Sequence, residues 1–534
     1  MSVKNDFNKR RTFAIISHPD AGKTTITEKL LLYGGAIQMA GTVKAKRSKK
    51  FATSDWMELE KKRGISVSSS VMAFPYKDHA INLIDTPGHE DFSEDTYRTL
   101  TAVDSALMLI DAANGVEAQT EKLFKVCHMQ KTPVMAFINK MDREGRDPFD
   151  LMQDIEDVLK IKTYPITWPI GMGERFRGVY NRNSNELLIY EKNSDRSRPV
   201  ALKGLSLSHP DIKNILNEEL DEDITEALLD EIELLEGAGD HFNREDYLAG
   251  KIAPVFFGSA INNFGVQTLL DNLIDLAPPP RFRESISRKV TPDEKKFSSF
   301  IFKIQANMDP SHRDRVAFMR ICSGTFERGM KAYHVRSKKQ LRLGRPTQFL
   351  AQDRSLVDEA VAGDIVGIHD PGVFKIGDTL SEGEALQFTG IPVFAPEHFV
   401  RVHLEDPLKG KQLKKGLDQL SEEGAVQVFR PITGNDQFLG VVGVLQFDVV
   451  QYRILAEYGV KVKFVPLPYS AARWVSAKDV AALEKFKKEQ AQNICLDQHG
   501  HPAILLDHAW RLKFYQDRHP DIEFMATSES VSGH

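Results

Sequence analysis

Residues 15–25 read IISHPDAGKTT, in which an apolar run leads through a short loop into a helical pattern. A strand-loop-helix segment that ends in Gly-Lys-Thr is typical of a phosphate-binding loop, whose full pattern is GxxxxGK[ST]. Gly22, Lys23 and Thr24 occupy the last three places, while Ser17 stands where the pattern has its first glycine. The stretch predicts a phosphate site on an α/β sheet, although a strand-to-helix turn that contains GKT by chance remains the alternative.

In such a loop the backbone N–H groups from Asp20 to Thr25 point toward a β-phosphate, and the positive end of the helix dipole assists them. Lys23 is placed to neutralise β- and γ-phosphate oxygens, and the Thr24 hydroxyl to bind Mg²⁺. We therefore expect a nucleotide with its metal ion.

A second motif, INLIDTPGHEDF at 81–92, ends another apolar run in Asp85. An aspartate at the carboxyl end of a buried strand holds Mg²⁺, usually through water, and the N–H of Gly88 then senses a γ-phosphate. An aspartate that caps a turn is the alternative. Two phosphate-site motifs in the expected order on neighbouring apolar runs argue against chance.

Two further motifs point to the base. FINKMD at 137–142 ends a strand, and the Asp142 carboxylate is suited to accept hydrogen bonds from guanine N1–H and the 2-amino group. Adenine offers neither donor, so it would leave that carboxylate without partners. GSA at 258–260 ends another strand, where a backbone N–H is placed to donate to guanine O6. Together the four motifs predict a guanine nucleotide site.

Hydrolysis requires a positioned water and a group that senses the triphosphate. Ser66, in KKRGISVSSS at 61–70, is a candidate to complete the Mg²⁺ shell in the triphosphate form. His89, directly after Gly88, is a candidate to orient the attacking water. A surface histidine on a loop is the alternative for His89. A metabolic phosphate-loop kinase and a binding module with an inactive site are the competing functions.

The sequence divides into three regions that differ in their pattern of apolar and polar residues. Residues 1–280 alternate apolar runs with amphipathic segments, which predicts a doubly wound, mostly parallel α/β sheet with an insertion near 148–250. Short strands separated by turns predict a β-barrel over 281–390. Mixed helical and strand patterns predict an α+β domain over 391–534, and we find no internal repeat.

Composition limits the remaining possibilities. The 534 residues carry 70 basic and 75 acidic side chains, a net charge of −5, so a general affinity for DNA is not expected. There is neither an apolar run of the ~20 residues that span a bilayer nor a secretion signal, and three widely separated cysteines favour a reducing, cytoplasmic location. Cys495, His499 and His501 have metal-ligand spacing, but a hairpin turn explains CLDQHGH better.

SHPDAGKTT, RGISV, DTPGHEDF, NKMD and GSA together resemble the GTPase domain of the translational GTPases, and most closely the branch of peptide chain release factor three. The similarity continues in AGDIVGIHDPGVFKIGDTL and LGVVGVLQFDVVQYRILAEYGVKV, so it covers nearly the whole chain. It implies a P-loop GTPase domain, a β-barrel domain and a ferredoxin-like α+β domain. There is no room for the further domains of elongation factor G, so a translocase is not expected.

Position by position, the resemblance implies His89 as the residue for ribosome-triggered hydrolysis. The implied metal contacts are Thr24, Ser66 and Asp85. The implied nucleotide contacts are Ser17, His18, Pro19, Asp20, Ala21, Gly22, Lys23, Thr24, Thr25, Asp85, Thr86, Pro87, Gly88, Asn139, Lys140, Met141, Asp142, Ser259 and Ala260.

The implied activity is ribosome-stimulated hydrolysis of GTP to GDP and phosphate, with Mg²⁺, by a cytoplasmic monomer. It serves translation termination: the GTPase promotes dissociation of stop-codon-reading release factors from the ribosome after peptide release. The partners are therefore ribosomal RNA, ribosomal proteins and those release factors, with no membrane. Guanosine tetraphosphate is a further candidate ligand, and another translational, ribosome-assembly or stress GTPase is the alternative.

Overall fold

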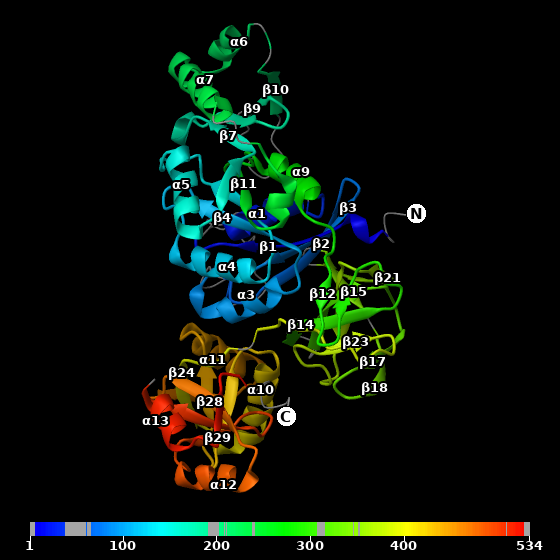
Figure 1. Ribbon diagram of the computed structural model, residues 1–534, viewed down its shortest axis with the longest axis vertical. Coiled ribbons are helices and arrows are strands. Elements are labelled where there is room, and N and C mark those ends of the chain that lie inside the picture. Colours follow the sequence, from blue (N-terminus) through cyan, green and yellow to red (C-terminus); the bar gives the residue numbers. More distant parts are fainter. Residues whose placement is uncertain are drawn as a thin grey trace.

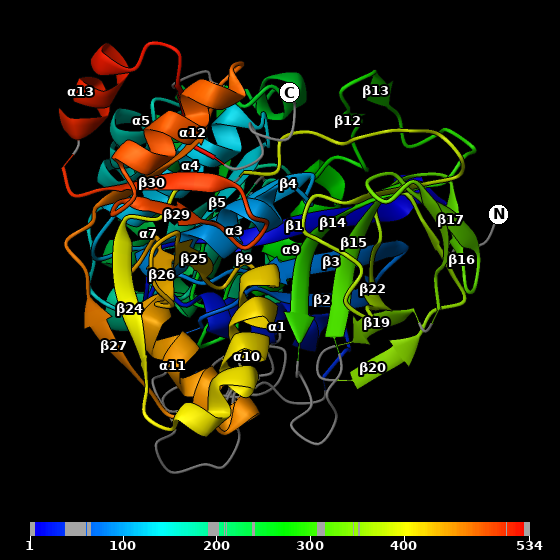
Figure 2. The ribbon, with the colours of Figure 1, turned by 90° about the horizontal axis from the view of Figure 1, so that it is seen from below.

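The structure is a computed structural model that describes residues 6–37, 60, 66–190, 202–207, 209, 211–237, 241–306, 315–344, 346–350, 353–392, 394–508 and 510–527. An N-terminal α/β domain lies above a β-rich domain and a C-terminal α+β domain, which lie side by side when seen from below (Figures 1 and 2). Among the described residues, no helix is long and apolar enough to cross a bilayer.

The N-terminal domain is built on a seven-stranded sheet in the order β2-β3-β1-β4-β5-β11-β6. Only β2 runs antiparallel to its neighbour, and the other pairs are parallel. The strands are β1 (Arg10–Ile16), β2 (Ser70–Tyr76), β3 (His79–Asp85), β4 (Ser105–Asp111), β5 (Val134–Asn139), β6 (Lys162–Pro165) and β11 (Ile252–Phe257).

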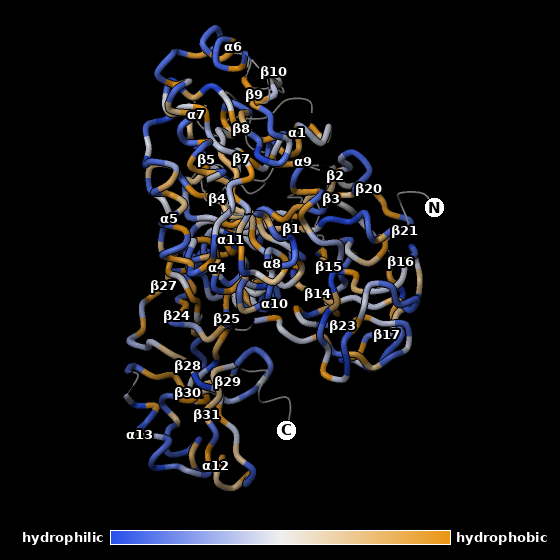
Figure 3. The backbone as a smooth tube through the Cα atoms, turned by 45° about the horizontal axis from the view of Figure 1, so that its top comes forward, coloured by the Kyte–Doolittle hydropathy of each residue, from blue (hydrophilic) through white to orange (hydrophobic). Residues whose placement is uncertain are grey.

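Helices cover both faces of this sheet, because successive residues of its central strands point to opposite sides. In β1, Phe13 and Ile15 pack with the apolar side chains of α1 and α9, whereas Ala14 and Ile16 pack with those of α4 and α5. Figure 3 shows hydrophobic residues along these strands. The helices are α1 (Lys23–Tyr33), α3 (Ser93–Leu100), α4 (Ala118–Met129), α5 (Pro148–Leu159), α8 (Arg244–Leu248) and α9 (Val266–Leu276), with the 3-10 turns η2 (Phe7–Lys9) and η3 (Glu90–Phe92). The doubly wound fold predicted from the sequence is confirmed.

Between β6 and β11 the chain forms a separate four-stranded antiparallel sheet, in the order β10-β9-β8-β7, with two helices over it (Figure 1). Its elements are β7 (Thr167–Ile170), η4 (Gly173–Arg175), β8 (Gly178–Asn181), β9 (Glu186–Tyr190), β10 (Leu202–Ser206), α6 (Ile212–Glu219) and α7 (Glu222–Gly237). In the predicted insertion near 148–250, α5 and β6 thus join the main layers and the segment after them forms the added sheet.

The second domain is an antiparallel half-barrel of eight strands in the order β18-β17-β23-β14-β15-β22-β19-β20. They are β14 (Ser298–Ala306), β15 (Arg315–Ser323), β17 (Lys331–His334), β18 (Lys339–Arg342), β19 (Thr347–Leu350), β20 (Asp353–Leu356), β22 (Ile365–His369) and β23 (Thr379–Ser381). Two short pairs form separate two-stranded sheets: β12 (Arg283–Glu284) with β13 (Lys289–Val290), and β16 (Thr325–Glu327) with β21 (Glu359–Val361).

The C-terminal domain contains two consecutive βαββαβ units. The first comprises β24 (His398–Leu404), η5 (Pro407–Lys409), α10 (Gly410–Glu422), β25 (Gln427–Pro431), β26 (Phe438–Val441), α11 (Leu445–Tyr458) and β27 (Val462–Pro466). The second comprises β28 (Ala471–Ser476), α12 (Val480–Glu489), β29 (Ile494–Leu496), β30 (Pro502–Leu506), α13 (Trp510–Arg518) and β31 (Glu523–Met525).

Pairing of β25 with β29 joins the two units into one sheet, in the order β27-β24-β26-β25-β29-β30-β28-β31. Each half has the split βαβ order of the ferredoxin-like fold. The predicted ferredoxin-like class is confirmed, and the structure adds a repeat of topology that the amino-acid sequence does not show.

Candidate functional site

The loop between β1 and α1 has the backbone of an anion-binding site. Asp20 (φ 64°) and Gly22 (φ 101°) both adopt the left-handed conformation, and α1 begins at Lys23. Alternation of such residues turns successive N–H groups toward one point, beside the positive end of the helix dipole. At Gly22 a Cβ atom would lie 2.4 Å from Asn139 Nδ2, so the close approach of this loop to β5 also requires glycine.

Ser17 holds the loop lysine. The Ser17 side chain is completely buried, and its Oγ donates to the His18 carbonyl (2.6 Å) and accepts from Lys23 Nζ (2.9 Å). Lys23 Nζ also donates to the His18 carbonyl at 3.2 Å. Burial lowers the pKa of Lys23 to about 8, although the carboxylates of Asp85 and Asp20 act to raise it. The serine is thus compatible with a phosphate loop and supplies a hydroxyl that a glycine would lack.

The other loop residues line this turn. His18 is buried: its backbone N–H donates to Thr120 Oγ1 (3.2 Å), and its Nε2 lies 2.9 Å from a Glu117 carboxylate oxygen. Burial, opposed by Glu117, lowers the pKa of His18. Ala21 is buried, Pro19 and Asp20 are exposed, and Thr24 and Thr25 are partly exposed in the first turn of α1.

The carboxyl end of β3 lies beside this loop. Asp85 is buried and its charge acts on Lys23, while the Thr86 hydroxyl donates to the Ile15 carbonyl at 2.6 Å. Pro87 follows, and its carbonyl accepts from the Thr96 hydroxyl (3.4 Å). A Cβ atom at Gly88 would lie 2.3 Å from Lys23 Nζ, so only glycine leaves the lysine head in place. The second motif therefore meets the first at the lysine.

His89 caps η3. Its Nδ1 accepts the Asp91 N–H at 3.2 Å, so the neutral ring carries its proton on Nε2. The side chain is 37% exposed, and its ring lies edge-on to Phe92 with 6.1 Å between centroids. The imidazole is therefore accessible and presents an N–H group that can hydrogen-bond to a water molecule.

Asn139 joins the base motifs to the phosphate loop. Its Nδ2 donates to the Ala21 carbonyl (2.8 Å) and its Oδ1 accepts the Ala260 N–H (2.9 Å). Asp142, which is partly buried, accepts from the buried Ser259 hydroxyl at 2.6 Å. One amide thus positions the phosphate loop and the GSA turn, and a second contact orients the carboxylate.

The two residues between them, Lys140 and Met141, lie in the same turn. Lys140 has a positive φ of 69°, and its Nζ pairs with Asp111 at 2.6 Å. Met141 is buried, and its N–H donates to the Gly258 carbonyl at 3.1 Å. The positive φ of Lys140 turns the main chain at the end of β5, and the Met141 contact ties that turn to the GSA segment.

Ser66 precedes β2, in which Ser70 pairs directly with Asp85 of β3. This register brings the Ser66 segment to the edge of the sheet where Asp85 lies. The preceding part of the motif, residues 61–65, lies outside the described residues.

Thr24, Ser66 and Asp85 offer only oxygen donors, which suits Mg²⁺. Among the described residues, no cluster of three or more His, Cys, Asp or Glu side chains is arranged to hold a metal. In the CLDQHGH segment, Asp497 Oδ1 accepts the N–H groups of His499 and His501 (2.8 and 2.9 Å). That segment is the turn between β29 and β30, and the predicted hairpin is confirmed.

Comparison with known proteins gives the family. Residues 8–279, half of the chain, match the Elongation factor Tu GTP binding domain. The chain belongs to the translational GTPases. This family binds guanine nucleotides, hydrolyses GTP and acts on the ribosome, so the chain is a translational GTP hydrolase.

Two further regions of this translational GTPase match families: Elongation factor G domain 2 over 296–383 and Class II release factor RF3, C-terminal domain, over 388–516. The predicted relationship to the release-factor branch is confirmed. Among solved structures, a crystal structure from Thermus thermophilus is similar with a TM-score of 0.69 and 25% identity, covering 88% of this chain and 70% of that chain.

The sequence motifs did not reveal the contacts between this site and the other domains. Asp91, two residues after His89, accepts the Leu445 N–H at the start of α11 (2.6 Å). Arg98 of α3 donates to the Gly424 carbonyl (3.4 Å) after α10. These partners lie more than 300 residues apart in the chain, so no local signal marks them.

We expect Lys23→Met to stabilise the translational GTPase while it removes nucleotide binding. Buried Lys23 has a pKa of about 8 against an ordinary value of 10.5, so its charge destabilises the folded state fully below pH 8. The methionine variant should gain about 1–3 kcal/mol of unfolding free energy at pH 7. That gain should shrink between pH 8 and 10.5, where the native lysine loses its proton first.

Denaturant unfolding without nucleotide, followed across this pH range, measures the gain. GDP binding should fall by at least about 100-fold, because Lys23 is the cation that we assign to the phosphates. Lys125→Met, at an exposed lysine of α4, is the control and should change neither quantity. An unchanged GDP affinity in Lys23→Met would refute the assignment.

Proposed function

We propose that this GTPase acts in translation termination, where it uses GTP on the ribosome to promote dissociation of stop-codon-reading release factors after peptide release. The observation that carries the proposal is the class II release factor match of the C-terminal domain, residues 388–516. The GTP-binding and barrel regions are shared with elongation factors, so this domain distinguishes the task.

Contacts between the GTP-binding domain and that C-terminal domain support the proposal. Asp91 caps the first turn of α11, and a Cβ atom at Gly443 would lie 2.2 Å from the Asp91 Cα. The loop that carries Gly88 and His89 is therefore packed against the release-factor domain. A change at the γ-phosphate that moves this loop must move or break the contact of Asp91 with α11, because closely packed surfaces cannot shift independently.

The geometry of the site supports the following proposed role for each residue. The loop N–H groups and Lys23 hold the β- and γ-phosphates, Asp142 reads guanine, and His89 orients water. Mg²⁺, held by Thr24, Ser66 and Asp85, would neutralise charge between the β- and γ-phosphates. We also propose a cytoplasmic monomer, and guanosine tetraphosphate as a second ligand of the same guanine site.

Two linked assays test the proposed function. GTP hydrolysis should rise by about 10³-fold or more when ribosomes are added, the scale on which partner proteins stimulate slow GTPases. On termination complexes with a limiting amount of stop-codon-reading factor, the protein and GTP should then increase the number of peptides released per factor. A guanosine imidotriphosphate arm, which cannot be hydrolysed, is the control.

Ribosome-stimulated hydrolysis without any gain in release-factor turnover would contradict the termination role and favour the assembly or stress alternative. Tight ATP binding without GTP preference would contradict the guanine site itself.

A further inference from the structure

A β-bulge turns Lys303 of the half-barrel toward the GTP-binding domain. In the β14–β15 pair, Ile301 lies opposite Met319 and Lys303 opposite the adjacent Phe318, so Phe302 is the extra residue. Strict alternation would place Lys303 on the barrel side together with Ile301. With the bulge, Ile301 and Ile304 both belong to the barrel core, and Lys303 points out of it.

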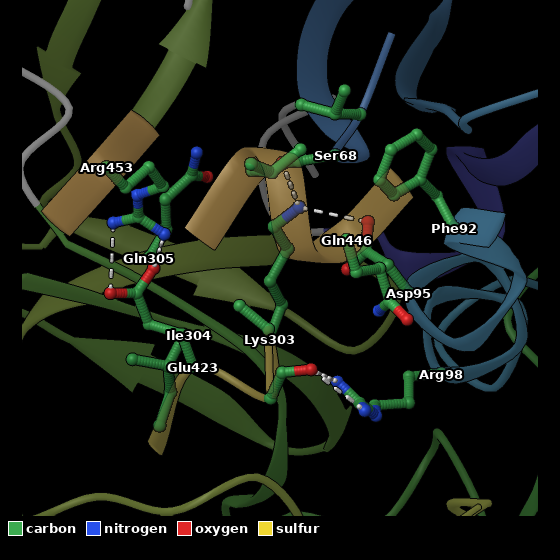
Figure 4. A pocket seen from close by; sticks show the side chains of 14 residues that line it. Ser68, Phe92, Asp95, Arg98, Lys303, Ile304, Gln305, Glu423, Gln446 and Arg453 are labelled. Carbon is green, nitrogen blue, oxygen red and sulfur yellow. Dashed lines mark hydrogen bonds and ion pairs between the residues drawn. The ribbon is translucent and has the colours of Figure 1, made fainter. Parts of the chain in front are cut away.

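The Lys303 ammonium group ends between two segments of the GTP-binding domain (Figure 4). Its Nζ donates to Ser68 Oγ (2.9 Å) and the Ser69 carbonyl (2.5 Å), and it pairs with Asp95 Oδ2 at 3.3 Å. The side chain is only 5% exposed. A buried ammonium is costly unless hydrogen-bonded, and these three acceptors compensate for the lost water.

Asp95 ties the same two segments together. Its Oδ2 accepts the Ser69 N–H at 2.5 Å, so Asp95 binds the N–H of Ser69 while Lys303 binds its carbonyl. Burial acts to raise the pKa of Asp95, but Lys303 and the Ser69 contact outweigh it and hold that pKa below its ordinary value. The carboxylate therefore stays charged at neutral pH.

The contacts of Lys303 and Asp95 with Ser68 and Ser69 lie close to Ser66 in the chain. Two residues extend at most about 7 Å, so the contacts at Ser68 limit how far Ser66 moves from them. The Val67 N–H donates to Glu60 (3.0 Å), and the Val67 side chain packs with Phe92 and Val449. On the other side, Asp95 lies in the first turn of α3, which follows the loop of His89.

We propose that Lys303 is a positioning residue for GTP binding: it holds the segment after Ser66 and the start of α3 in the arrangement that binds the γ-phosphate end of GTP. The inference rests on the proposed role of Ser66 as a metal ligand. The barrel thus takes part in distinguishing GTP from GDP, although none of its residues lies in the nucleotide motifs.

We expect the loss of Lys303 to affect binding of the triphosphate and not binding of GDP. The contacts that we assign to the β-phosphate and the base come from the loop after β1 and from Asn139, Asp142 and Ser259, none of which touches Lys303. Lys303→Met should therefore leave GDP affinity unchanged. It should weaken guanosine imidotriphosphate binding by roughly 5- to 30-fold and raise the Mg²⁺ concentration required for that binding.

Arg10→Met is the matched control, because Arg10 forms a buried pair with Asp364 (3.1 Å) between the same two domains. It lies at the start of β1, opposite the end that leads into the phosphate loop. It should lower thermal stability without changing the ratio of the two nucleotide affinities. If Lys303→Met does not fold, Ser68→Ala removes one contact of the ammonium and should show the same selectivity with a smaller loss.

The test is to measure the affinities of the full chain and its variants for GDP and the triphosphate analogue at several Mg²⁺ concentrations. Ser66→Ala is included as a third variant. Equal losses for GDP and the triphosphate analogue, or equal behaviour of Lys303→Met and Arg10→Met, would overturn the inference. If only Ser66→Ala weakens the triphosphate analogue more than GDP, the role of Lys303 is refuted and the role of Ser66 as a metal ligand stands. If no variant shows that difference, both roles are refuted.

Discussion

Asp142→Asn should lower GTP and GDP affinity by about 10²- to 10⁴-fold, or about 3–5 kcal/mol. The Asp142 carboxylate is suited to accept both N1–H and the 2-amino group of guanine. An asparagine turns one acceptor into an N–H₂ donor, which then faces another donor across a partly buried contact. The loss is large because both donors would be left opposed or unpaired after desolvation.

The same variant should gain affinity for xanthine nucleotides, in which a 2-oxo group replaces the 2-amino group. The asparagine Nδ2 would donate to that oxygen while Oδ1 still accepts N1–H. Competition binding with GDP and xanthosine diphosphate measures the exchange of preference. Retention of guanine preference by the asparagine variant would show that Asp142 does not read the base.

Ser259→Ala provides a graded control. It removes the 2.6 Å hydrogen bond that orients the Asp142 carboxylate but leaves both of its acceptors. We expect a loss of about tenfold or less for guanine nucleotides, the usual scale of one hydrogen bond, and no gain for xanthine. The pair of variants thus separates recognition of the base from support of the carboxylate.

The sequence was most informative where short motifs coincide with strand ends. The apolar runs that precede Lys23, Asp85 and Asn139 are buried parallel strands, β1, β3 and β5, whose carboxyl ends meet at one edge of the sheet. The alternation of apolar runs with amphipathic segments predicts a parallel sheet, and the motifs at the carboxyl ends of its strands are therefore expected to converge. The distances among them, such as Asn139 Nδ2 to the Ala21 carbonyl, required the structure.

Ser17 shows what a pattern cannot express. The phosphate-loop pattern describes which backbone conformations are tolerated, and by that measure a serine in the first position is a departure. In the structure the Ser17 hydroxyl accepts from Lys23 Nζ at 2.9 Å, a contact made through a side chain that the pattern omits. Ser17 therefore departs from the pattern and at the same time supplies a hydrogen bond to the loop lysine.

Lys303 shows a second limit. Its strand is buried along its whole length, so the sequence gives no sign that one lysine faces another domain. The bulge at Phe302 decides its direction, and a bulge shifts the two-residue period by one without a mark in composition. The second βαββαβ unit was likewise visible only in the structure, because the two units share the order of their helices and strands and not their residues.

His89→Ala should reduce the ribosome-stimulated rate of GTP hydrolysis by about 10²- to 10⁴-fold, the usual contribution of a positioned acid–base group. Affinity for GDP should stay within about twofold of the parent, because we assign that binding to the phosphate loop and Asp142. Single-turnover hydrolysis at saturating ribosome concentration separates this loss from weaker ribosome binding.

The alanine variant alone leaves one ambiguity, because His89 also caps η3 through its Nδ1 and the Asp91 N–H. His89→Asn resolves it. Asparagine is among the best capping residues, so it restores the acceptor for Asp91 and keeps the packing of Asp91 against α11. Its shorter side chain does not restore the Nε2–H. We therefore expect the asparagine variant to recover stability and remain as slow as alanine, whereas recovery of the rate would assign His89 to structure rather than to hydrolysis.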